Sequence, residues 1–234
     1  MTVISLQSKS KDCGLKKIMT LNNIEFNQKG SATTFITGLA GDMEVLITRP
    51  VELIESTPIV VISHPHPLYG GSMTNKVVHI LAKSFSELGA ITVRFNFRGV
   101  GKSAGKYDDG IGEAEDLQVL VEKLKQWRPH APVWLAGFSF GAYVTTRAQK
   151  VIQAEKLLLV APPVSMYPFA ELKEITVPYI VIQGGQDEVI DAAAVKNWVS
   201  EQSNQPELIW MEEAGHFFHG KLIEVKEALL KVWG

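Results

Sequence analysis

The chain has 234 residues, which is enough for one large α/β domain or two small ones. Hydrophobic residues make up 46% of the sequence and charged residues 21%, a composition that excludes a disordered or collagen-like protein. The formal net charge of -2 provides no general attraction to nucleic acid or anionic lipid. We therefore expect a small-molecule partner, and neither nucleic acid nor a membrane.

The beginning of the chain carries few residues that could pack into a core. The single cysteine, Cys13, has no second thiol for an internal disulfide, which is typical of a reducing compartment. The sequence has neither the apolar segment of a signal peptide nor a run of about 18 apolar residues. These features predict a cytoplasmic protein. Because residues 8–17 are polar and Met19 follows, we expect a mobile leader over residues 1–18 and a single domain over residues 19–234.

Hydrophobic periodicity predicts a regular alternation of strands and helices after residue 33. An antiparallel hairpin is expected from residues 33–39 and 43–48, followed by buried parallel strands at residues 59–62, 91–97, 133–136, 157–160, 179–182 and 207–210. Helices are expected at residues 76–88, 113–126, 140–151, 192–201 and 221–232, with Thr74 or Asn75 capping the first. This order predicts an α/β fold: a mostly parallel twisted sheet with an antiparallel N-terminal edge and helices on both faces. Ligands of such sheets bind at the carboxyl ends of the strands.

The segment Gly137-Phe138-Ser139-Phe140-Gly141 joins a predicted strand to a predicted helix. A G-x-S-x-G pattern in this context is typical of a nucleophile elbow, a sharp turn that projects a serine hydroxyl above the sheet. A plain Gly/Ser turn is the alternative, since the pattern by itself is common. The flanking strand and helix favour Ser139 as a nucleophile.

A serine hydroxyl needs a histidine as general base and an acid to orient that histidine. Asp187 follows a predicted strand and a glycine-rich turn, and His216 follows the last predicted strand. We favour Asp187 as the acid. Glu188 and Asp191 compete with it, although either could be an exposed loop charge or a helix N-cap. His219 competes with His216 for the role of the base.

Four ordered motifs then establish a resemblance to the α/β-hydrolases. They are S-H-P-H-P-L-Y-G-G at residues 63–71, F-N-F-R-G-V-G-x-S at 95–103, G-x-S-x-G at 137–141 and G-H-F-F-H-G at 215–220. The chain is more narrowly similar to a small uncapped family of predicted serine hydrolases and esterases. The resemblance runs from about residue 33 to the C-terminus and implies a triad of Ser139, Asp187 and His216, but no substrate. Lys221 stands where the last motif would have arginine.

An oxyanion hole of this kind uses the backbone N–H after the nucleophile and one from the loop after an earlier strand. Phe140 supplies the first donor. In the segment at residues 64–71 the two prolines lack an N–H, so the second donor is His66, Leu68 or a later residue. Alignment of the first two residues of this segment with the superfamily's His-Gly pair favours His66.

The loop in which lids of the superfamily usually insert comprises only residues 161–178, which predicts an uncapped and open site. We expect a substrate pocket lined by Leu68, Tyr69, Phe138 and Phe217. Further candidates for the apolar wall are Met73, Met166, Tyr167 and Phe218. The Tyr69 hydroxyl could instead bond the oxyanion, and all of the aromatic residues could simply be core.

Two other kinds of binding site, for a metal and for a nucleotide, are less well supported by the sequence. The histidine pairs His64/His66 and His216/His219 could suggest zinc, but the serine motif already uses His216, so we expect no metal and no other cofactor. Residues 99–104 resemble incomplete glycine-rich nucleotide loops. Arg98 beside them is expected to brace the loop rather than to bind a substrate carboxylate.

The sequence thus predicts a serine hydrolase, and specifically a carboxylesterase that acts on small or short-acyl esters through an acyl-enzyme. A peptidase, thioesterase or acyltransferase on the same fold is the alternative, because the triad does not fix the leaving group. From another class, the chain could be a non-catalytic ligand-binding or scaffold protein. The partner is a small-molecule ester, and the exposed hairpin edge could pair in a homodimer.

Overall fold

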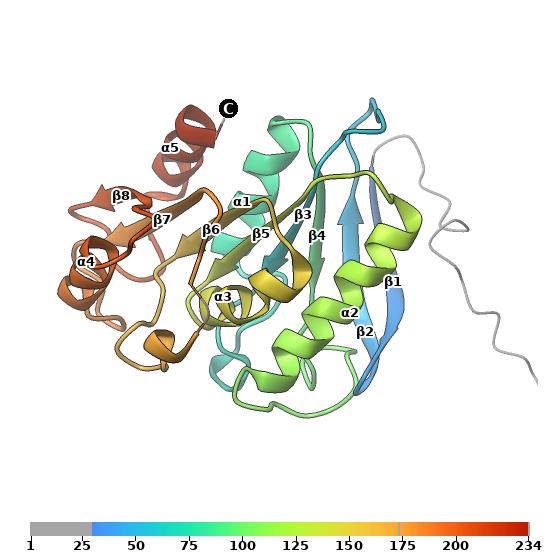
Figure 1. Ribbon diagram of the computed structural model, residues 1–234, viewed down its shortest axis with the longest axis horizontal. Helices are drawn as coiled ribbons and strands as arrows, with labels where there is room; N and C mark the ends of the chain where they lie inside the picture. Colours follow the sequence, from blue (N-terminus) through green and yellow to red (C-terminus); the bar gives the residue numbers. More distant parts are fainter. Residues whose placement is uncertain (1–29, 173, 234) are drawn as a thin grey trace, which may run out of the picture.

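The computed structural model describes residues 30–172 and 174–233 (Figure 1). The described strands form one eight-stranded sheet in the order β1-β2-β4-β3-β5-β6-β7-β8. They are β1 (Ser31–Gly38), β2 (Gly41–Thr48), β3 (Ile59–Ser63), β4 (Ile91–Phe95), β5 (Val133–Phe138), β6 (Lys156–Val160), β7 (Tyr179–Gly184) and β8 (Glu207–Met211). Strands β1 and β2 pair antiparallel, as do β2 and β4, and every other pair is parallel. The predicted α/β fold with an antiparallel N-terminal edge is confirmed.

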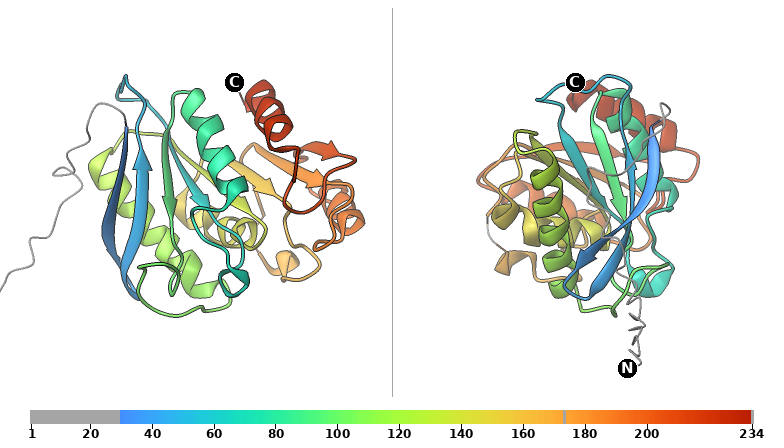
Figure 2. Two further views of the ribbon diagram at one scale, coloured as in Figure 1. Left: turned by 180° about the vertical axis from the view of Figure 1, so that it is seen from behind. Right: turned by 90° about the vertical axis from the view of Figure 1, so that its right-hand side faces the viewer.

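Five α-helices cover both faces of this sheet in the described part of the chain: α1 (Lys76–Glu87), α2 (Ile111–Trp127), α3 (Phe140–Ile152), α4 (Ala192–Ser200) and α5 (Leu222–Trp233). Helices α2 and α3 cover one face, and α1 and α5 cover the other (Figure 2). The buried strand β3 serves both layers, because Val61 packs with the α2/α3 core and its neighbours Val60 and Ile62 pack with the α1/α5 core. The two sheet faces therefore carry separate hydrophobic cores.

Local capping sets where the helices begin. Asn75, one of the two predicted caps, accepts hydrogen bonds from the backbone N–H groups of Val77 at 2.8 Å and Val78 at 3.4 Å. Helix α2 begins at Ile111, two residues before the predicted start at residue 113. The reason is that the buried carboxylate of Glu113 reaches back to the N–H groups just before the helix, including that of Gly110 at 2.9 Å.

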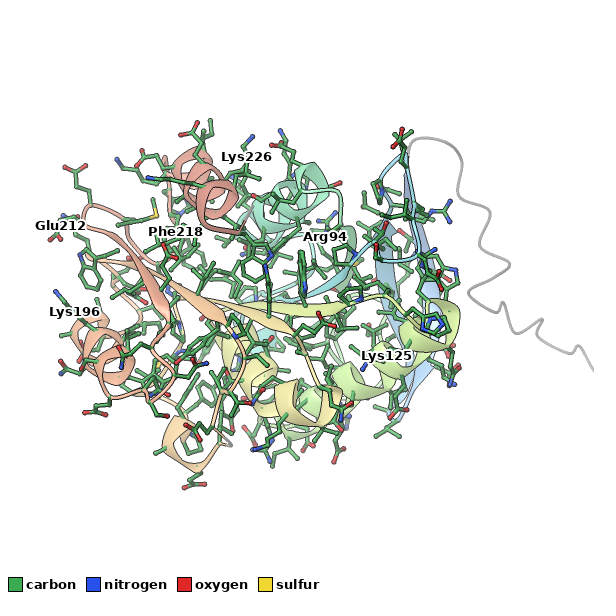
Figure 3. All side chains as sticks on the ribbon, turned by 45° about the horizontal axis from the view of Figure 1, so that its top comes forward. Arg94, Lys125, Lys196, Glu212, Phe218 and Lys226 are labelled. Carbon is green, nitrogen blue, oxygen red and sulfur yellow. The ribbon has the colours of Figure 1, made fainter. Side chains whose placement is uncertain are left out.

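Salt bridges and hydrogen bonds link neighbouring helices at their ends. Lys226 of α5 pairs with Glu87 of α1 at 3.0 Å, and Lys125 of α2 donates to the carbonyl of Ile152 of α3 at 2.8 Å. Figure 3 shows Lys226 and Lys125 on opposite sides of the sheet. These contacts join α5 to α1 on one face of the sheet and α2 to α3 on the other.

Two predictions from the sequence fall outside the described residues: the leader over residues 1–18 and the environment of Cys13. Within residues 30–172 and 174–233, no helix has the length and apolar character needed to cross a membrane.

Arg98, in the loop after β4, is held by buried groups. Its Nε donates to Asp116 at 2.8 Å, and Nη2 donates to the carbonyl of Gly112 at 2.7 Å. The Arg98 side chain is 11% exposed and that of Asp116 only 1%. All of these contacts tie the loop to α2, so Arg98 is a brace for the loop that borders the carboxyl ends of the strands.

This arrangement predicts that Arg98→Ala lowers the free energy of unfolding by about 3–5 kcal/mol, because it leaves the buried carboxylate of Asp116 unpaired. Urea denaturation measures the change, with Arg147→Ala on the exposed side of α3 as a control expected to cost less than about 0.5 kcal/mol. Unchanged stability of Arg98→Ala would contradict the bracing role.

Candidate active site

Ser139 occupies a sharp turn between β5 and α3. Its backbone has φ 55° and ψ -122°, a conformation that is unfavourable for a residue with a side chain. A Cβ atom on Gly137 would lie 2.2 Å from the carbonyl oxygen of Gly141, and one on Gly141 would lie 2.3 Å from that of Ser63. Only glycine allows these approaches. The turn therefore lifts the Ser139 side chain above the carboxyl end of the sheet.

The structure brings Ser139, His216 and Asp187 together in one chain of hydrogen bonds. The distance from Ser139 Oγ to His216 Nε2 is 3.1 Å, and that from His216 Nδ1 to Asp187 Oδ2 is 2.9 Å. The side chains of His216 and Asp187 are 3% and 0% exposed. Because Nδ1–H donates to the carboxylate, Nε2 is free to accept the serine proton. The arrangement has the geometry of a nucleophile, a general base and an acid.

The Asp187 carboxylate receives hydrogen bonds on both oxygens. Oδ1 accepts from the N–H groups of Val189 at 2.9 Å and Ile190 at 2.7 Å, while Oδ2 also accepts from Nε2 of Gln183 at 3.1 Å. Burial by itself would raise the pKa of Asp187, but the hydrogen bond from His216, these backbone donors and the charge of His216 lower it below its usual range. Asp187 is therefore ionised at neutral pH.

The alternative candidates for the acid and the base make other contacts in the structure. Asp191 caps α4, accepting from the N–H groups of Ala193 at 2.9 Å and Ala194 at 3.1 Å. His219 is exposed, with its ring 5.9 Å from that of Phe217. Glu188 accepts a hydrogen bond from the backbone N–H of His216, a contact that sequence reasoning did not foresee.

The two residues expected to supply the oxyanion donors are in contact through their side chains. Phe140 is the first residue of α3, so the helix offers its N–H no carbonyl acceptor. The His66 ring lies 5.0 Å from the Phe140 ring, and its Nδ1 accepts from the N–H of Leu68 at 3.2 Å. The N–H groups of Tyr69 and of the two glycines after it bond to carbonyls of the same turn. Within the described segment 66–71, only the His66 N–H has no protein acceptor, and this favours His66 over Leu68 as the second donor.

His64 connects this loop to the end of β4. Its Nδ1–H donates to the carbonyl of Pro65 at 2.6 Å, and its Nε2 accepts from the N–H of Phe97 at 3.0 Å. Burial lowers the pKa of His64 to about 4, although the hydrogen bond to Pro65 opposes that shift. A neutral His64 thus fixes the backbone next to His66. In the sequence, His64 stands out only within its motif and in one of the histidine pairs considered for zinc.

The expected pocket residues fall into two groups. Leu68 and Tyr69 lie on the short 3₁₀ helix η2 (Pro67–Tyr69) and are 68% and 85% exposed, and Phe217 is 38% exposed. Phe138 is fully buried, with its ring 5.0 Å from that of His216, so it supports the histidine instead of lining a pocket. Strand β5 continues to Phe138, and its side chain points into the core.

Of the further candidates for the wall, Met73 and Phe218 are buried in the core, while Met166 is exposed. Phe218 is the labelled residue beneath α5 in Figure 3. Tyr167 contacts the ring of Phe140 at 5.5 Å, and so does Tyr107 at 5.7 Å. Sequence reasoning did not single out Tyr107, which lies in the loop after β4, because no pattern marks which aromatic residue of that loop packs against Phe140.

Residues 58–226 match the family model of the alpha/beta hydrolase domain. The chain belongs to this family. It is 40% identical to XC6422 from Xanthomonas campestris, described as an a/b serine hydrolase without lid, with a TM-score of 0.82 over 86% of this chain and 93% of that one. An alpha-beta serine hydrolase homologue from Coxiella burnetii is 46% identical, with a TM-score of 0.83 over 87% and 97%.

Among curated proteins, the hydrolase is 37% identical over 184 residues to the uncharacterized protein RP471 of Rickettsia prowazekii, covering 74% of this chain and 77% of that protein. The family and the serine hydrolase relatives support hydrolysis as the reaction class. In this fold without a lid, the segment between β6 and β7 contains only the short 3₁₀ helix η3 (Phe169–Glu171) in its described part.

The buried, neutral His64 predicts a pH dependence of stability. An unfolded histidine binds its proton near pH 6.5, but folded His64 does so only near pH 4, so the free energy of unfolding falls as the pH drops through this window. His64 contributes up to about 3 kcal/mol to the fall. Urea denaturation from pH 7 to pH 4 should show a smaller fall in His64→Gln than in the wild type. Identical falls would contradict the assignment.

Proposed function

We propose that this hydrolase is a serine carboxylesterase that cleaves small or short-acyl esters through an acyl-enzyme. The observation that carries the proposal is the hydrogen-bonded chain of Ser139, His216 and Asp187, which begins at a serine in a strained turn. Strain of this kind costs about 1–3 kcal/mol and persists where the surrounding structure holds it in place for a purpose.

In the first half of the reaction, Ser139 Oγ attacks the ester carbonyl while His216 Nε2 takes the hydroxyl proton. The ionised Asp187 orients the imidazole and stabilises its protonated form. The backbone N–H groups of Phe140 and His66 bind the oxyanion of the tetrahedral intermediate. His216 then gives its proton to the departing alcohol, which leaves the acyl group on Ser139.

In the second half, water attacks the acyl carbonyl and His216 takes the water proton. The second tetrahedral intermediate uses the same two N–H donors, and its collapse returns the proton to Ser139 and releases the acid. The reaction needs no cofactor, because every proton transfer passes through His216.

The surroundings of the serine support small, partly apolar esters. Leu68, Tyr69 and Phe217 present exposed apolar surface on the loops that carry His66 and His216. An open site of this kind offers few subsites to grip a peptide chain, which favours esters over amides. On composition, we also propose a cytoplasmic location and a small-molecule partner.

The rival activities are a peptidase, a thioesterase or an acyltransferase, which would use the same three side chains. A non-catalytic binding protein is disfavoured, because it would have no chemical use for a strained serine beside a base with a buried, ionised acid.

The proposal predicts hydrolysis of p-nitrophenyl esters, with the highest kcat/KM among the short acyl chains of a series from acetate to decanoate. Ser139→Ala should lower kcat at least about 1,000-fold, because the nucleophile is lost. Ser200→Ala, at the exposed end of α4, is the control that should retain activity.

Circular dichroism verifies that all three proteins are folded. If Ser139→Ala hydrolyses the esters as fast as the wild type, the serine mechanism is wrong. If folded wild type is inert toward the whole series, the carboxylesterase proposal fails in favour of an amide or thioester substrate.

A further inference from the structure

Two consecutive carboxylates hold the same histidine from different sides. Asp187 Oδ2 binds the ring Nδ1–H of His216, with 2.9 Å between the two heavy atoms. Glu188 Oε2 accepts a hydrogen bond from the backbone N–H of His216 at 3.0 Å. One segment of the loop after β7 therefore fixes both the ring and the main chain of the residue that faces Ser139.

The segment containing Glu188 lies directly against the turn that contains His216. The N–H of Gln186 donates to the carbonyl of Ala214 at 3.0 Å, so the two loops are joined through their backbones. A Cβ atom on Gly215 would lie 2.7 Å from Glu188 Oε2. The carboxylate thus fits against the backbone next to His216, in space that any larger residue at position 215 would occupy.

We propose that Glu188 is a positioning residue for His216, an inference that rests on the proposed function. His216 has to keep Nε2 within hydrogen-bond distance of Ser139 Oγ, and this separation is 3.1 Å in the structure. Glu188 fixes the main chain that carries the ring. A displacement of about 1 Å at a reacting group costs on the order of 100-fold in rate, so loss of this anchor should slow the chemistry.

Glu188 acts through the position of its acceptor oxygen. Its side chain is exposed, so water and salt screen its charge, whereas the hydrogen bond requires an oxygen at the end of a side chain of this length. Glutamine keeps an acceptor oxygen at the same distance from the main chain, whereas the shorter aspartate side chain holds its oxygens too far from the N–H of His216. The two substitutions therefore separate reach from charge.

The test uses the full chain and compares Glu188→Gln, Glu188→Asp and Glu188→Ala. Glu213→Ala is the control, since Glu213 is a 76% exposed glutamate in the loop after β8 that also contains His216, and it pairs with Lys221 instead. The readouts are the rate at which a fluorophosphonate labels Ser139, kcat and KM for p-nitrophenyl acetate, and the thermal unfolding midpoint.

We expect Glu188→Ala and Glu188→Asp to label at least tenfold more slowly than the wild type, with a matching loss in kcat and a KM within twofold. Glu188→Gln and Glu213→Ala should stay within threefold of the wild type. All variants should keep similar unfolding midpoints. If Glu188→Ala labels at the wild-type rate, or Glu188→Gln is as slow as Glu188→Ala, the positioning role is wrong while the proposed function stands.

Hydrogen exchange at the His216 backbone N–H tests the anchor without any activity. Exchange should be at least tenfold faster in Glu188→Ala than in the wild type, and Glu188→Gln should restore slow exchange. Equal exchange in all three would overturn the proposal. Absence of labelling in folded wild type would instead overturn the proposed function, and the exchange measurement would still decide the role of Glu188.

Discussion

The active site depends on a contact between backbones that leaves no room for a side chain. At the turn between β5 and α3, Gly141 lies against the carbonyl of Ser63 at the end of β3, and Gly137 lies against Gly141 itself. This packing forces Ser139 into its strained backbone conformation. It also brings the start of the loop after β3 against the first turn of α3, the two segments that carry the proposed oxyanion donors His66 and Phe140.

The electrostatics of the site depend on the pair formed by His216 and the buried Asp187. Burial opposes the negative charge of Asp187, and its hydrogen bonds outweigh that cost, so a carboxylate with no exposed surface stays ionised beside the imidazole. The buried ring of Phe138 packs against the same imidazole. Because the ring is supported on several sides, it keeps its position while His216 accepts and donates protons.

The sequence predicts the fold well, because β-branched apolar runs and helical spacing depend only on which side chains need burial. It also marks Ser139, since G-x-S-x-G between a strand and a helix has few other uses. It favours Asp187 over Glu188 and Asp191, but three acids in one short loop compete because the directions of their side chains depend on the turn. It cannot tell that Phe138 faces the core while Phe217 faces outward, or that burial keeps His64 neutral.

The central claim is that Ser139 forms a covalent acyl intermediate. The most direct measurement is acid quenching of the protein during turnover of a p-nitrophenyl ester, followed by peptide mass spectrometry. The account predicts an added acyl mass on the peptide that contains Ser139, and none on that peptide in Ser139→Ala. An acyl group on another residue, or turnover without any acylated peptide under conditions that trap a burst, would contradict it.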